Sequence, residues 1–157
     1  SYKHYQTWSK EMNQEYDEFG LVGENLTIDD FNEREIYIGD ELMIGDCVFQ
    51  ISQPRIPCYK IGIKMNSRDF PKKFSQSGLL GSYMRVLETG KISKNDDVKH
   101  IRKESNSLSI YEVSEILFKD VGNIDKMKHA LDLKYLTEEI KERFRERLMK
   151  LGDYSSL

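Results

Sequence analysis

The spacing of hydrophobic and polar residues divides the chain into a β-rich first part and a helical last part. Tyr5, Trp8 and Met12 recur at helical spacing, so we predict one amphipathic helix over residues 2–14. From residue 35 onwards the spacing becomes that of strands, with short apolar runs between turn residues. We expect strands at residues 35–38, 41–44, 47–52, 59–64, 81–88 and 98–101. Short strands with little helix between them favour a barrel or a strongly coiled sheet.

Turn signals separate several of these predicted strands. Gly39-Asp40 and Gly45-Asp46 follow two of the runs, and Thr89-Gly90 follows a third. Glycine tolerates the positive φ angles that tight turns require, which is why such pairs commonly connect neighbouring strands. These pairs therefore mark tight turns between the predicted runs.

The helical part begins near residue 104. Ser109 precedes an apolar period and is expected to cap a first helix that ends at Gly122-Asn123. A short second helix follows over residues 124–131, and Thr137 is expected to cap a third that reaches Leu148. Glu138 and Glu139 would lie at its positive end, where carboxylates are favourable. We therefore predict a β-rich domain over residues 1–103 and a three-helix extension over residues 104–157.

Composition and charge exclude several classes of function. The chain has 157 residues, of which 38% are hydrophobic, enough for one ordinary domain with a buried core. Its 24 basic and 27 acidic residues give a net charge of −3, which predicts no general attraction to nucleic acid or to anionic membranes. No apolar run has the length of a transmembrane helix, which is roughly 20 residues. Two cysteines are too few for a disulfide framework, so we expect a reducing, cytoplasmic setting.

Common catalytic and binding motifs are missing from the sequence. It has no nucleophile elbow, no phosphate-binding loop of the Walker type and no dinucleotide fingerprint. His4, His100 and His129 are scattered without metal-ligand spacing, so we interpret them as surface or packing histidines. Residues 104–157 carry 9 basic and 11 acidic side chains, a balance that argues against a nucleic-acid-binding helix pair.

The segment Gln50-Ile51-Ser52-Gln53-Pro54-Arg55-Ile56-Pro57-Cys58 concentrates two of the three prolines and one of the two cysteines. Proline fixes its own φ and biases the preceding residue to extended geometry, so Cys58 follows a stiffened backbone. Arg55 could stabilise a thiolate or bind an anionic group. Residue chemistry alone leaves three alternatives for Cys58: a thiol beside a proline kink, a soft metal ligand or a nucleophile. Cys47, on an alternating strand, is expected to be inert core.

Three motifs occur in order along the first part of the chain: Gly-Glu-Asn-Leu-Thr at 23–27, Glu-Ile-Tyr-Ile-Gly-Asp at 35–40 and Ser-Gln-Pro-Arg-Ile-Pro-Cys at 52–58. Together they resemble the signatures of the MOSC domain, the C-terminal domain of molybdenum cofactor sulfurases. The helical extension resembles that of the stand-alone YiiM-type branch, which is associated with resistance to 6-hydroxylaminopurine. The resemblance implies a mainly β fold with helices: a MOSC-type β-barrel, related to the pyruvate-kinase barrel domain, plus a C-terminal three-helix tail.

The resemblance also implies site residues and a cofactor. Cys58 matches the family cysteine that binds the molybdenum of a pterin cofactor or carries sulfur, so it is both the catalytic and the metal-binding candidate. Arg55 is a candidate for the anionic pterin phosphate, and Arg85 is a weaker one. Glu24 and Asn25 are expected to order a loop over the cofactor pocket, although Asn25 could equally be a turn residue. We expect no pyridoxal phosphate in this chain, because no lysine has a recognisable Schiff-base context.

The implied activity is a molybdenum-dependent reduction of N-hydroxylated compounds, base analogues among them, to amines. No flavin or iron–sulfur motif is visible in the sequence, so a partner protein that carries one of these groups would donate the electrons. Two alternatives stay open: a sulfur carrier that holds a persulfide on Cys58, and a non-enzymatic cofactor-binding module whose tail dimerises. Family members carry further barrel strands and a Gly-Gly-x-Asp-Lys-Ala segment before the position of Tyr2. Barrel closure and one pocket wall are expected to depend on them.

Overall fold

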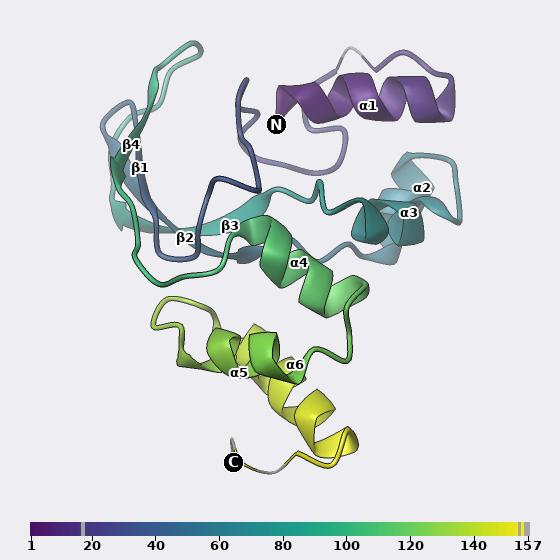
Figure 1. The fold of residues 1–157 in the computed structure, drawn as a ribbon. Helices are drawn as coiled ribbons and strands as arrows, with labels where there is room; N and C mark the ends of the chain where they lie inside the picture. Colours follow the sequence, from purple (N-terminus) through teal and green to yellow (C-terminus); the bar gives the residue numbers. More distant parts are fainter. Residues whose placement is uncertain (17, 154, 156–157) are drawn as a thin grey trace.

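The computed structural model describes residues 1–16, 18–153 and 155, and its centre is a four-stranded antiparallel sheet (Figure 1). The strand order is β3-β2-β1-β4. Strand bounds are Glu41–Ile44 for β1, Cys47–Pro54 for β2, Ser82–Glu88 for β3 and Val98–Arg102 for β4. The predicted Gly45-Asp46 turn joins β1 to β2, and Gly45 has a φ of 55°. The mainly β fold class with a helical tail is therefore confirmed.

Strand β2 is buried along its whole length. Ile51 joins a large apolar cluster with the C-terminal helices α4 (Ile110–Phe118), α5 (Ile124–Asp132) and α6 (Glu138–Lys150). Cys47 and Phe49, nearer the start of the strand, belong to a smaller cluster against which Leu26 and Ile28 pack. Cys47 is 6% exposed, which agrees with its predicted place in the core.

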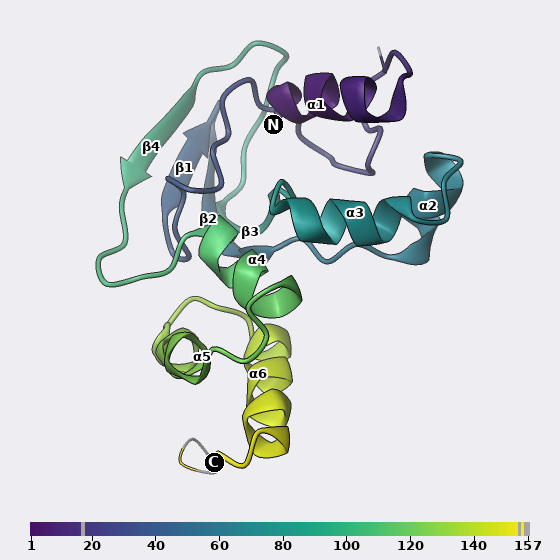
Figure 2. The same cartoon turned by 45° about the vertical axis from the view of Figure 1, so that its right-hand side comes forward.

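A third apolar cluster joins the N-terminal helix to two short helices at one end of the sheet. Helix α1 (Tyr2–Met12) buries Trp8 against α2 (Tyr59–Lys64) and α3 (Phe70–Ser77). The Trp8 and Phe70 rings make an edge-to-face contact with centroids 5.0 Å apart. Figures 1 and 2 both show α1 on the opposite side of the molecule from α5 and α6. None of the described helices is long and apolar enough to cross a membrane.

Two of the predicted strands are wrong. Residues 59–64 form helix α2, which buries Ile61 and places Met65 beside it one turn later. The alternating pattern was misleading because Ile63 points to solvent. Residues 35–38 contribute only an isolated bridge, between Tyr37 and Ser109. Their partner segment turns into helix α4 directly after Ser109, so the pairing cannot extend into a strand.

Several helix boundaries also differ from the prediction. Helix α3 was not predicted, although Phe70 and Phe74 lie one turn apart on it and Pro71 stands in its first turn. Helix α4 ends at Phe118, before Gly122-Asn123, and α1 ends at Met12. Thr137 precedes α6 as expected, but its side chain makes no capping bond and donates instead to the Gln53 side chain.

The three-helix extension itself is confirmed. Phe144 and Leu148 of α6 belong to the same apolar cluster as Leu42 and Ile51 of the sheet. The division into residues 1–103 and 104–157 stays a prediction, and in the structure the two parts share this core.

Candidate functional site

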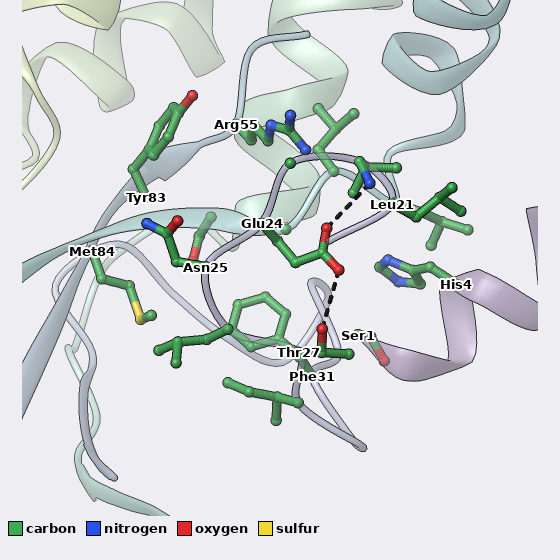
Figure 3. A pocket seen from close by; sticks show the side chains of 18 of the residues that line it. Ser1, His4, Leu21, Glu24, Asn25, Thr27, Phe31, Arg55, Tyr83 and Met84 are labelled. Carbon is green, nitrogen blue, oxygen red and sulfur yellow. Dashed lines mark hydrogen bonds between the residues drawn. The ribbon is translucent and has the colours of Figure 1, made fainter. Parts of the chain in front are cut away.

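A pocket of about 480 Å³ lies between α1, the loop 20–28, the start of β3 and the inner face of α3 (Figure 3). Apolar side chains such as Phe31, Leu80 and Met84 form most of its wall. The polar exceptions are few, as in cofactor and small-molecule sites. They include His4, Glu24, Asn25, Thr27 and Arg55.

Glu24 organises the loop that forms one wall of the pocket. Its carboxylate accepts hydrogen bonds from the backbone N–H groups of Gly20 (2.9 Å) and Val22 (3.2 Å). It also accepts from the hydroxyl of Thr27 at 3.1 Å and from the hydroxyl of Tyr5. Burial opposes ionisation of Glu24, but the hydrogen bond from Tyr5 and those from the loop outweigh it and lower its pKa. The expected ordering of the loop by Glu24 is thus visible in the hydrogen bonds.

Arg55 places a partly unpaired guanidinium in the pocket wall. Its Nη1 is buried and makes no hydrogen bond within the described residues. The group lies 5.9 Å from the centroid of the Phe74 ring, and a Cβ on Gly23 would come within 3.3 Å of its Nη2. Gly23 also has a φ of 82°, so both its backbone and the space beside it suit glycine.

A second unpaired donor lies in the same wall. The indole N–H of Trp8 is buried and has no hydrogen-bond partner in the part of the chain that the structure describes. Buried donors without acceptors are costly, by about 1–3 kcal/mol each, so they point to a ligand or water that accepts from them. Arginine and indole offer donors only. A group that bonds to either nitrogen must therefore be an acceptor, and an anion would also match the charge of Arg55.

His4 is a pocket residue that the sequence analysis missed, and the buried Glu33 contacts it. Glu33 is 2% exposed, and its carboxylate accepts from the Gly81 N–H at 3.0 Å. The other carboxylate oxygen lies 3.2 Å from the His4 Nε2, and His4 lines the pocket (Figure 3). The residues are 29 positions apart in sequence and His4 sits on a plain amphipathic helix, so no motif links them. A pocket histidine bonded to a buried carboxylate can give or take a proton.

Of the other predicted site residues, Asn25 lies in the pocket wall and Cys58 does not. Asn25 lines the pocket beside Tyr83 (Figure 3). Cys58 is a free, exposed thiol at the start of α2 and is not among the pocket-lining residues. Cys58 itself has extended backbone, with φ −119° and ψ 170°.

Arg85 is tied to the helical side of the molecule. Its Nη1 donates to the Tyr135 carbonyl at 2.8 Å and contacts the Gln50 side-chain oxygen at 3.3 Å. The structure therefore brings Glu24, Asn25 and Arg55 together, whereas Cys58 and Arg85 lie outside this pocket. Among the described residues no group of three or more His, Cys, Asp or Glu side chains could hold a metal ion.

Comparison with known proteins supports the family suggested by the motifs. The chain is 28% identical over 149 residues to the uncharacterized protein YflK of Bacillus subtilis, which covers 95% of this chain and 67% of YflK. It is 26% identical over 157 residues to the protein YiiM of Escherichia coli, covering 98% of this chain and 70% of YiiM. A protein named reductase from Gibberella moniliformis is 32% identical over 117 residues, 73% of this chain but only 21% of that protein.

Solved structures agree with these relatives. The crystal structure of YiiM from Geobacillus stearothermophilus is similar with a TM-score of 0.89 and 30% identity, covering 94% of this chain and 75% of that one. YiiM from Escherichia coli gives a TM-score of 0.80 at 25% identity and covers 98% and 78%. The family model of the MOSC domain matches residues 1–99, which include all three sequence motifs and most of the pocket wall. The chain therefore belongs to the MOSC domain family.

Proposed function

We propose that this protein binds a molybdenum–pterin cofactor and reduces N-hydroxylated compounds to the corresponding amines. The observation that carries the proposal is the pair of unpaired buried donors, Arg55 Nη1 and Trp8 Nε1, on two residues that line a mostly apolar pocket. Two comparisons also support this proposal: membership of the MOSC family, and the similarity to a protein named reductase.

Each polar residue has a role in this proposal. Arg55 binds the anionic end of the cofactor, and Glu24 holds the loop 20–28 in place beside it. Asn25 offers an amide to the same pocket. Cys58 lies outside the pocket lining, and its free, exposed thiol would supply a soft thiolate ligand for the metal. Arg85 is not assigned a direct contact with the cofactor, because its guanidinium already donates to the Tyr135 carbonyl.

The reaction requires electrons that this chain does not itself carry. When bound, the cofactor supplies a two-electron redox centre. Reduction of R–NH–OH breaks the N–O bond, consumes two electrons and two protons, and releases R–NH₂ and water. His4, bonded to buried Glu33, lies in the pocket as a candidate proton donor. An external protein with a flavin or an iron–sulfur cluster supplies the electrons.

The direct test measures metal, pterin and turnover in the full-length protein from a molybdenum-replete host. We expect molybdenum and pterin near one equivalent each, and reduction of 6-hydroxylaminopurine by reduced methyl viologen. Cys58→Ser is expected to lose the turnover at least a hundredfold, in line with the loss of a metal ligand or reacting group. Cys47→Ala is the matched control, because it removes the other thiol from the core. Equal turnover by Cys58→Ser and the wild type would exclude the role of Cys58.

A sulfur carrier is the second candidate, and the exposure of the Cys58 thiol favours it. In that case the thiolate would accept a sulfur atom from a cysteine desulfurase as a persulfide. Mass spectrometry after incubation with a desulfurase and cysteine would show a stable gain of one sulfur on Cys58. Absence of the adduct, with turnover retained, favours the reductase.

A further inference from the structure

Helix α2 and the start of α3 form an exposed surface that the proposed pocket does not use. We name it the α2–α3 surface and define it by Cys58, Tyr59, Lys60, Ile63, Lys64, Arg68 and Lys72. Tyr59 and Ile63 lie one helical turn apart, and each is 72% exposed. With Arg68 they border one shallow hollow. An apolar centre inside a polar rim is the anatomy of a protein interface.

The rim of this surface is strongly basic, in contrast to the rest of the molecule. Residues 58–73 hold five basic side chains and one acidic side chain, whereas the whole chain has 24 basic and 27 acidic. Within the described residues, Lys60, Arg68 and Lys72 are exposed and form no ion pair. Lys64 donates to the Gly20 carbonyl, a contact that leaves its charge uncompensated. An acidic partner would therefore meet at least four free positive charges.

The α2–α3 surface also lies close to the proposed redox site. Phe74 of α3 lines the pocket from the inside, while Lys72 of the same helix is exposed on the outside. One helix, roughly 10 Å thick, separates the two. Cys58 opens α2 at the edge of the surface, so the proposed metal ligand belongs to it directly. Figures 1 and 2 place α2 and α3 together at one end of the molecule, away from β4.

We propose that the α2–α3 surface is the docking site for a small acidic electron-carrier protein with a flavin or an iron–sulfur cluster. This inference rests on the proposed function, because that reaction needs two electrons from outside the chain. The carrier is oxidised by two electrons in total. The substrate N–O bond breaks, and the oxygen leaves as water with two protons from solvent. Opposite charges accelerate such brief encounters, and interfaces between electron-transfer partners are small.

The first test compares two electron sources in the holoprotein. The donors are reduced methyl viologen, which needs no docking site, and a reduced acidic flavodoxin or [2Fe–2S] ferredoxin from the same host. Lys60→Glu/Lys72→Glu, which leaves the Lys64–Gly20 contact with the pocket loop intact, is expected to lower kcat/KM for the protein donor about tenfold or more and to weaken its salt dependence. Turnover with viologen should stay within about twofold. The matched control is Lys94→Glu/Lys99→Glu, the same charge change on two exposed residues, one in the loop before β4 and one in β4 itself.

The outcomes separate this inference from the proposed function. If viologen drives no turnover in the wild type, the proposed function fails and the docking site with it. If viologen drives turnover but neither carrier does, or the Lys60/Lys72 variant matches its control with a carrier, only the docking site is wrong.

A second test does not depend on activity. Oxidised flavodoxin is added to ¹⁵N-labelled protein at low salt, and backbone amide shifts are followed by NMR. We expect the largest shifts in residues 58–73, reduced at 0.2 M NaCl, and a several-fold weaker response in Tyr59→Ser/Ile63→Ser. Shifts confined to other elements would overturn the inference. So would a dimer, measured by sedimentation, that Lys60→Glu/Lys72→Glu dissociates, because the surface would then bind a second copy.

Discussion

At the scale of single residues, Glu24 and Arg55 show two opposite uses of a charged group in one pocket. The Glu24 carboxylate is saturated by four donors and holds the loop. The Arg55 guanidinium keeps one buried nitrogen unpaired, so it has capacity left for a ligand. The first residue therefore matters for stability and the second for binding.

We expect Glu24→Ala to destabilise the protein by about 1–3 kcal/mol, because it leaves buried N–H groups of the loop without an acceptor. Urea unfolding followed by circular dichroism measures the change. Glu18→Ala, at an exposed position before the same loop, should change stability by less than about 0.5 kcal/mol. Equal midpoints for the two variants would mean that the loop does not depend on the Glu24 carboxylate.

Arg55→Met is expected to separate binding from stability. It keeps a long apolar side chain against Phe74 but removes the charge, so retained molybdenum and pterin should fall at least tenfold. The free energy of unfolding of the cofactor-free protein should not fall by more than about 1 kcal/mol, because an unpaired buried donor is removed as well. Arg145→Met on α6, whose partners are Glu138 and Glu142, serves as control for cofactor content. Unchanged cofactor content in Arg55→Met would exclude Arg55 as the anion ligand.

At the scale of elements, the start of α4 is the best-specified boundary. Ser109 accepts from the Glu112 N–H at 3.2 Å, and the Glu112 carboxylate accepts from the Ser109 N–H at 2.8 Å. This reciprocal pair is a capping box, and it lies where the chain leaves its bridge to Tyr37. The capping box therefore fixes where α4 begins. It also fixes the point at which the chain passes from the sheet to the helical extension.

Ser109→Ala is expected to cost about 1.5–2 kcal/mol of stability, the upper part of the roughly 0.5–2 kcal/mol range for helix caps, because Ser109 is buried. Thermal and urea unfolding measure it. Ser105→Ala, on the exposed segment just before, should be neutral within about 0.5 kcal/mol. A change no larger than that of the control would show that the Glu112 side of the box suffices alone.

Helices α2 and α3 illustrate why local pattern is not decisive for short elements. Tyr59, Ile61 and Ile63 alternate like a strand, but only Ile61 finds an apolar partner surface, formed by Trp8 and Phe74. A helix buries Ile61 together with Met65, which a strand at this place would not do. The packing partners come from distant segments, so sequence spacing did not reveal them.

At the scale of the whole molecule, acid should weaken the fold through two carboxylates. Burial alone would raise the pKa of Glu24, but the hydrogen bonds from Tyr5 and from the loop lower it below its ordinary 4.5. The hydrogen bond from Lys128, 2.7 Å away, lowers the pKa of Asp153 to about 2 and ties the end of the chain after α6 to α5. A lowered carboxyl pKa stabilises the folded state above the unfolded pKa, and this contribution is lost as the pH falls through the folded value.

We therefore expect the urea midpoint of the wild type to fall steadily from about pH 4.5 down to pH 2. The double variant Glu24→Gln/Asp153→Asn should start lower at pH 6 and show a shallower fall over the same range. Parallel curves for the two proteins would mean that other groups dominate the acid response. The control is Glu18→Gln/Glu146→Gln, which removes the same net charge at two exposed carboxylates.

Sequence by itself determined the family motifs, the strand positions of β1 to β4, the turn at Gly45-Asp46, the cap at Ser109 and the three C-terminal helices. These features depend on local spacing and backbone preference, which neighbouring residues carry. Tertiary structure alone decided the rest. It turned residues 59–64 into a helix, brought His4 to Glu33, left Arg55 and Trp8 unpaired in one wall, and placed Cys58 on a basic exterior surface. Each of these depends on side chains that are distant along the chain, so only the packing of the elements could bring them together or keep them apart.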